Sequence, residues 1–129
     1  MHGGDAHGYE YKIMNRETTK NWIQLVPGVR RKTVAVGDNM MQVMVFFEAG
    51  AKVPEHAHVH EQITTIVSGR MRFTVAGQPQ ELSQGNAIAL HSNVPHAAEA
   101  VEDSLLLDTF NPRREDLLKA DAEHAKKSA

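Results

Sequence analysis

A run of alternating histidines is the feature that most constrains this chain of 129 residues. His56, His58 and His60 stand two residues apart, and a further histidine, His96, lies well downstream. In an extended strand, side chains two residues apart point to the same face, so the alternation predicts imidazoles side by side. Two imidazoles on one face, joined by a third from elsewhere, form a metal site with positions open to small ligands. The pattern therefore favours chemistry or small-molecule binding over a structural role.

The hydrophobic pattern around these histidines predicts an all-β fold. The expected strands cover residues 33–36, 40–48, 61–67, 70–75, 80–82, 86–90, 96–101 and 104–110. Many short strands separated by regular turn signals are typical of a sandwich or barrel. The density of large side chains in 40–48 suggests a strand buried on both faces. Residues 22–29 read as a loop with a turn at Pro27-Gly28.

The hydrophobic period changes after residue 112. Asn111 can serve as an N-cap, and Pro112 suits the first turn of a helix. Leu118, Ala122 and Ala125 fall on one helical face, so we expect a surface helix over 113–126.

The chain is expected to form one domain with three parts, an N-terminal arm (1–21), a barrel (22–112) and a helical C-terminus (113–129). Residues 1–12 of the arm are rich in glycine and histidine, and we expect them to be mobile or to be donated as a strand to a partner.

Composition narrows the function classes. The net charge of -2 and the lack of a basic stripe argue against a nucleic-acid partner, and the cluster Arg30-Arg31-Lys32 reads as solvated surface. The longest apolar run is too short to span a bilayer, so no membrane partner is expected. Cysteine is absent, which excludes disulfides and thiolate ligands. No secretory signal is visible, and we expect a cytoplasmic protein.

Two motifs resemble those of the cupin superfamily. The first is Gly50-x5-His56-x-His58-x3-Gln62-x6-Gly69, with glutamine where glutamate is usual; the second is Gly85-x5-His91-x-Asn93-x2-His96. The resemblance implies a double-stranded β-helix, a jelly-roll barrel that is often dimeric. It also implies that His56, His58, Gln62 and His96 point into the barrel and bind one divalent transition metal.

Several features of the metal site stay open at this level. Mixed nitrogen and oxygen ligation does not choose among Ni(II), Zn(II), Fe(II), Mn(II) and Cu(II). Glu61 competes with Gln62 for the fourth position, and the spacing to Gly69 favours Gln62. His60 has the parity of a ligand, but a turn after the histidine pair would place it at the barrel mouth instead.

A narrower resemblance lies in three segments, one of them inside the first motif and two outside both motifs. Residues 22–29, 58–62 and 108–116 together are similar to the pectin-degradation cupins, which convert 4,5-unsaturated uronates into open-chain keto-uronates. The resemblance implies catalytic roles for Asp108, Phe110 and Arg114. An arginine offers a bidentate fork to a uronate carboxylate, an aspartate can move protons, and a phenyl ring can wall a sugar face. The segment beginning at His91 departs from the family pattern.

The prediction is therefore a homodimeric, metal-dependent enzyme that linearises an unsaturated uronate, with a sugar acid as its small-molecule substrate. Two alternatives remain open. A metal-dependent dioxygenase would use the same ligands, because open coordination positions admit O2 as well as a sugar. A sugar-binding or sensor cupin would bind a sugar acid without turning it over.

Overall fold

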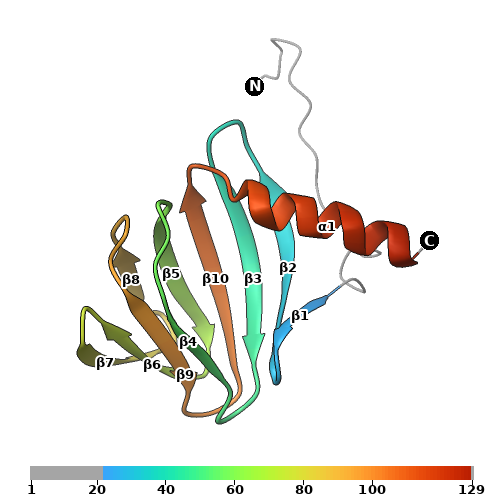
Figure 1. Cartoon of the computed structure of the whole chain (residues 1–129). Coiled ribbons are helices and arrows are strands. Elements are labelled where there is room, and N and C mark those ends of the chain that lie inside the picture. The colour runs from blue at the N-terminus through green and yellow to red at the C-terminus, as the bar shows by residue number, and fades with distance from the viewer. Residues whose placement is uncertain (1–21, 129) are drawn as a thin grey trace, which may run out of the picture.

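The computed structural model describes residues 22–128, so the expected arm over 1–21 lies outside the described part of the chain. Ten strands form two antiparallel sheets, and one helix follows them (Figure 1). The strands are β1 (Ile23–Val26), β2 (Val29–Val36), β3 (Met41–Phe47), β4 (Lys52–His56), β5 (Glu61–Ser68), β6 (Arg70–Val75), β7 (Gln78–Ser83), β8 (Ala87–Leu90), β9 (His96–Ala100) and β10 (Ser104–Asn111). The helix, α1, covers Glu115–Ser128.

The first sheet has six strands in the order β1-β2-β3-β10-β5-β8, and the second has four in the order β4-β9-β6-β7. Strands that follow one another in the sequence thus often lie in different sheets, as is expected of a jelly-roll barrel. The two sheets face each other across a shared apolar core, to which β3, β5, β6 and β10 all contribute buried side chains. The prediction of an all-β jelly roll with a C-terminal helix is confirmed.

Strand β3 differs from its prediction in one respect. Its burial alternates along the strand: Met41, Val43, Val45 and Phe47 are buried, and the residues between them are half-buried. The strand is therefore not buried on both faces, as its apolar density suggested. One face packs into the barrel and the other lies on the outside of the six-stranded sheet.

The entry to the barrel was also predicted wrongly. Ile23–Val26 is not loop but strand β1, which pairs with β2 across the turn at Pro27-Gly28. The turn itself was predicted, and Gly28 has a φ of +79°, which glycine adopts readily. The sequence did not predict this strand because it is only four residues long and has no clear alternation of polar and apolar side chains.

The helix starts two residues later than expected, at Glu115, because Asn111 is still the last residue of β10 and cannot cap a helix. The face of the helix that packs against the barrel also differs from the predicted one. Leu117 and Leu118 pack against the core, whereas Ala122 and Ala125 are exposed. None of the described helix is long and apolar enough to cross a membrane.

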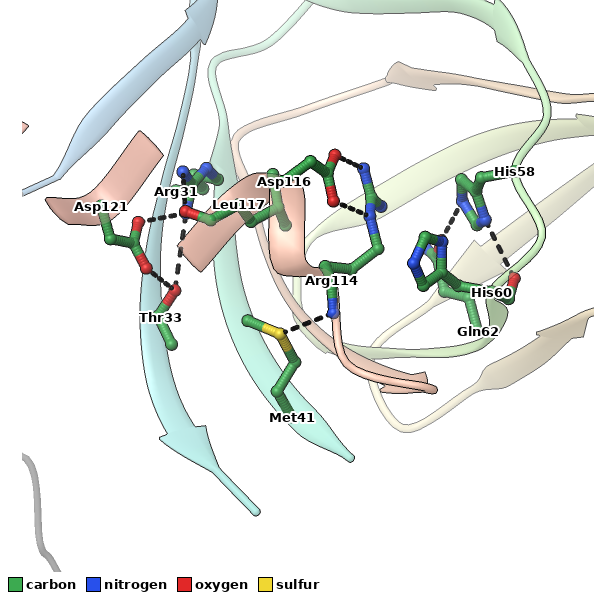
Figure 2. A network of polar contacts seen from close by, with 10 residues as sticks. All are labelled: Arg31, Thr33, Met41, His58, His60, Gln62, Arg114, Asp116, Leu117 and Asp121. Atoms are coloured by element: carbon green, nitrogen blue, oxygen red, sulfur yellow. Dashed lines mark hydrogen bonds and ion pairs between the residues drawn. The ribbon is translucent and has the colours of Figure 1, made fainter. Parts of the chain in front are cut away.

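A buried arginine fastens α1 to the barrel. Arg31 on β2 is only 2% exposed, and its Nη1 lies 2.8 Å from the Asp121 carboxylate of α1, which also accepts a 2.6 Å hydrogen bond from Thr33. Figure 2 shows this group beside the start of the helix. The prediction that the cluster around Arg31 is solvated surface is therefore wrong for Arg31. Alternation along β2 turns Arg30 outward and Arg31 inward.

Gly69 in the first motif has a steric reason to be glycine. It has a φ of +94° in the tight link between β5 and β6. A Cβ at this position would collide with the Ser104 hydroxyl and the backbone carbonyl of Asp103. The close approach keeps β5 in line with β10, and β5 carries part of the candidate site.

Candidate active site

A cavity of about 350 Å³ opens between the two sheets. Its wall is mostly apolar and includes Val43, Val45, Phe47 and Leu106 from the six-stranded sheet. Polar side chains enter it from both sheets and from the residues just before α1: His56, Gln62, His96, Asp108 and Arg114. A mostly apolar pocket with a few convergent polar groups is the usual form of a small-molecule site.

Three histidines from different elements lie together, and two of them, His56 and His96, line the cavity. His56 ends β4 and pairs in register with His96, the first residue of β9, while His58 lies in the loop after β4. The ring centroids of His56 and His96 are 4.3 Å apart, and those of His58 and His96 are 5.0 Å apart. One nitrogen from each ring lies within 4.8 Å of the other two. The trio could therefore hold one metal ion.

The two histidines of the first motif do not share a strand face, as the alternation had suggested. Strand β4 ends at His56, and the chain bends into a loop before β5 begins. His58 reaches the site because its Nδ1 is held by the backbone carbonyl of His60, two residues further along this loop. The three rings lie together, but their grouping depends on the loop rather than on strand alternation.

Each ring of the trio is oriented by a backbone carbonyl. Nδ1 of His56 lies 2.9 Å from the Pro54 carbonyl, Nδ1 of His58 lies 2.9 Å from that of His60, and Nδ1 of His96 lies 2.9 Å from that of Val94. A carbonyl can only accept, so each Nδ1 carries the proton in a neutral ring. Every Nε2 is then left with a lone pair, which is the arrangement found in histidines that bind metals.

The donor chemistry fits a bound cation. Nε2 of His96 is buried and has no hydrogen-bond partner among the described residues. Nε2 of His58 lies 3.1 Å from Oε1 of Gln62, so two lone pairs face each other when His58 is protonated on Nδ1. A shared cation would satisfy all of these atoms at once. Burial lowers the pKa of both His58 and His96, and the positive charge of Arg114 adds to this, which favours the neutral rings a metal requires.

Gln62 is the start of a chain of hydrogen bonds that leads away from the histidines. Its Nε2 donates to the Thr64 hydroxyl at 2.9 Å, and this hydroxyl donates to Oδ1 of Asp108 at 2.7 Å. Glu61, the competing acid, is exposed on the other face of β5 and lies 3.8 Å from His91. Alternation along β5 therefore turns Gln62 to the cavity and Glu61 away from it.

Asp108 lines the cavity and is half-buried. Burial raises the pKa of its carboxyl from 3.8 to about 6, while hydrogen bonds from Thr64 and Gln62 and the charge of Arg114 limit the rise. A carboxyl group in this range can both accept and release a proton near neutral pH. The sequence resemblance named this residue, but only the structure gives a physical reason for its raised pKa.

Arg114 stands over the ring of Phe110, with its guanidinium carbon 4.9 Å from the ring centroid. Its Nε and Nη2 are already engaged by the Asp116 carboxylate, at 3.0 Å and 2.9 Å (Figure 2). This pairing lowers the pKa of Asp116 to about 2. The fork expected to be open for a ligand is thus occupied, and the Nη1 edge is the part of the guanidinium without a hydrogen bond to Asp116.

The remaining candidate, His60, is half-buried, and its ring lies 5.5 Å from that of His58. Its Nδ1 is buried without a partner among the described residues, but the ring is not part of the trio that could hold a metal. Sequence reasoning missed Thr64 and Asp116. Thr64 has the same parity along β5 as Gln62, which was the one signal available for it.

Comparison with known proteins agrees with this architecture. The Cupin domain family matches residues 43–109, which include the histidines, Gln62 and Asp108. The chain belongs to the cupin domain family.

Particular relatives narrow the comparison. The pectin degradation protein KdgF of Dickeya dadantii is 34% identical over 99 residues, which cover 75% of this chain and 90% of that protein. The structure of KdgF from Halomonas sp. superposes with a TM-score of 0.78 at 36% identity, covering 84% of this chain and 99% of that one. An RmlC-like cupin from Shewanella frigidimarina gives a TM-score of 0.77 at 29% identity, covering 84% and 96% of the two chains.

The histidine trio predicts the metal content of the protein. Wild-type protein should bind one divalent transition metal per chain, and His96→Ala should bind it far more weakly because it loses a buried ligand. His91→Ala is the matched control, since His91 lies in the same motif but is exposed and outside the trio. Elemental analysis after metal loading measures all three proteins. Equal metal in wild type and His96→Ala would contradict the site.

The raised pKa of Asp108 predicts a pH-dependent stability difference. The folded protein binds this proton more tightly than the unfolded chain, so the favourable contribution is complete below about pH 4 and is lost as pH rises through about 6. Asp108→Asn removes the cost of the buried charge. The difference between the free energy of unfolding of Asp108→Asn and that of the wild type should therefore shift in favour of the variant from pH 4 to pH 8. The shift should be at most about 3 kcal/mol, at 1.36 kcal/mol per pKa unit.

Urea unfolding in the presence of a chelator measures this difference without a contribution from metal. A gap between the two proteins that stays constant with pH would show that Asp108 titrates normally in the folded state.

Proposed function

We propose that this protein converts a 4,5-unsaturated uronate into its open-chain keto-uronate, as a metal-dependent enzyme. The observation that carries the proposal is that one cavity is lined by two histidines of the trio, His56 and His96, by the Asp108 carboxyl and by Arg114, with His58 beside the two histidines. The similarity to a pectin degradation protein over most of the chain supports a substrate of this class, because pectin is built largely from uronates. Uronates carry a carboxylate and several hydroxyls, which suit the cation and the polar groups of this cavity.

The substrate carboxylate is bound by Arg114. The Nε and Nη2 edge of its guanidinium is held by Asp116, so the carboxylate pairs with the Nη1 edge. Phe110 lies under the guanidinium, offers an apolar surface beside it, and packs within 6.0 Å of the His58 ring. Together these groups orient the sugar between the arginine and the histidines.

Asp108 moves the protons of the reaction. It takes the proton from the C1 hydroxyl, the bond between C1 and the ring oxygen breaks, and an aldehyde forms at C1. The electron pair passes to the ring oxygen and leaves an enolate at C5. Asp108 then delivers its proton to C4, and the enolate becomes a ketone at C5. No atom is gained or lost, so the reaction is an isomerisation that needs only proton transfers.

A metal held by His56, His58, His96 and Gln62 supplies Lewis-acid polarisation of a substrate oxygen. Three neutral imidazoles and an amide leave the full double charge of the ion in place. The ion is Ni, Zn, Fe, Mn or Cu, and the donor set does not choose among them. The absence of cysteine suits a reducing compartment, and cytoplasmic localisation stays a prediction that cell fractionation would check.

Substitutions of Asp108 and of Arg114 should change different kinetic constants. Asp108→Asn keeps the shape of the carboxyl but cannot transfer protons, so kcat should fall by roughly 10²–10⁴ with little change in KM. Arg114→Ala should mainly raise KM, because a contact to a charged group is typically worth about 1.5–3 kcal/mol. Turnover is followed as the loss of ultraviolet absorbance from the C4=C5 double bond.

Metal content is measured on the same samples, and neither substitution should change it. Turnover should be unaffected by removing O2, since the reaction is not an oxidation. Strict dependence on O2 would favour the dioxygenase alternative, and binding without turnover would favour a sensor. Wild-type kcat in Asp108→Asn would remove that residue from the mechanism.

We also propose that the protein is a homodimer joined through the outer face of the six-stranded sheet. Ile63 and Val67 of β5 are 48% and 39% exposed on this face, next to the outward side chains of β10 and β3. Exposed apolar patches of this kind mark interaction surfaces.

Light scattering at micromolar concentration should show a dimer for the wild type and a shift to monomer for Ile63→Lys. Val101→Lys is the control, because Val101 is similarly exposed but lies in the β9–β10 link rather than on this sheet face. A monomeric wild type would contradict the proposal.

A further inference from the structure

Thr64 stands at the junction between the histidine trio and Asp108. It is completely buried in the middle of β5, and its Cα pairs directly with that of Asp108 on the neighbouring strand β10. Gln62 precedes it by two residues on the same face. Side chains that lie opposite each other across two strands are close enough to interact, and residues two apart on one strand share a face. Thr64 can therefore contact both neighbours at once, and its hydroxyl does so.

The proton count of this hydroxyl fixes the direction of both contacts. A threonine hydroxyl has one proton to donate, and an ionised carboxylate can only accept. Thr64 gives its proton to Asp108 at 2.7 Å, so it can only accept from Gln62. The group of Gln62 that faces Thr64 must then be its NH2, at 2.9 Å, and its carbonyl oxygen must face His58. Thr64 thus sets the orientation of the Gln62 amide, and the hydrogen bond that Gln62 also makes to Asp108 favours the same orientation.

We infer that Thr64 is a positioning residue that turns the Gln62 oxygen toward the histidine trio and holds the Asp108 carboxylate, which links metal binding to the acid in one hydrogen-bonded unit. The inference rests on the proposed function for the roles of Gln62 and Asp108. It adds a residue that acts through Gln62 and Asp108. It also explains why an amide can serve where cupins usually have glutamate: a carboxylate has two equivalent oxygens, whereas an amide must be held the right way round.

Thr64→Val tests the inference because valine keeps the shape of threonine and removes the hydroxyl. The Gln62 amide would then keep only its contact with Asp108. It should more often turn its NH2 toward the histidines, where it cannot act as a ligand. The affinity for Ni²⁺, measured in competition with a chromophoric chelator, should fall roughly 10–100-fold, as is usual when a partner of a metal ligand is removed. The kcat should fall as well, with a smaller change in KM. Thr64→Ser, which keeps the hydroxyl, should have a Ni²⁺ affinity and a kcat close to those of the wild type.

Thr65→Val is the matched control. Thr65 is the next residue on β5, its side chain is on the outer face, and the same chemical change there should leave Ni²⁺ affinity and turnover as in the wild type. Thermal unfolding of each variant shows whether it is folded.

A double-mutant cycle distinguishes positioning from a general structural role. In Gln62→Glu the ligand has two equivalent oxygens, so no amide needs to be oriented. Thr64→Val should then cost little Ni²⁺ affinity in the Gln62→Glu background and much in the wild-type background. Equal losses in both backgrounds would overturn the inference, as would wild-type affinity and kcat in Thr64→Val. A wild type that binds neither Ni²⁺ nor Zn²⁺ would instead overturn the proposed metal site.

Discussion

Three backbone carbonyls set the chemistry of this protein. By accepting hydrogen bonds from Nδ1 of His56, His58 and His96, the carbonyls of Pro54, His60 and Val94 fix the tautomer of each ring and aim three Nε2 lone pairs at one place. The donors and acceptors belong to the same local segments, in each case two residues apart. The orientation of the rings is therefore built into the backbone, and the barrel only has to bring the segments together.

The barrel adds partial burial to this arrangement. Burial raises the pKa of Asp108 to about 6, and it lowers the pKa of His58 and His96. Both shifts follow from the same cause, the cost of a charge away from water. The two shifts have different consequences. The Asp108 carboxyl becomes able to exchange protons near neutral pH, and the imidazoles of His58 and His96 stay neutral. Arg114 stays in this environment because Asp116 and the ring of Phe110 stabilise its charge.

The sequence was informative where a residue's role depends on its close neighbours. The motifs that resemble those of cupins named the histidines and Gln62 as neighbours, and the alternation in 70–75 predicted β6. The sequence was less informative where a role depends on strand register. The contact of Thr64 with Asp108 and the ion pair of Arg31 with Asp121 join residues far apart in the chain. His58 was placed on a strand because alternation cannot show where a strand ends. The resemblance pointed to Arg114 as an open fork, but the carboxylate two residues away already engages it.

The most direct test of the account follows the atoms of a 4,5-unsaturated uronate by NMR in D2O. With metal-loaded protein, the account predicts a metal-dependent loss of the vinyl signal at C4, well above the rate without protein. It also predicts an open-chain product of unchanged connectivity elsewhere, with one deuteron added at C4. A product that has gained oxygen, or a vinyl signal that decays at the rate seen without protein for every metal tried, would contradict it.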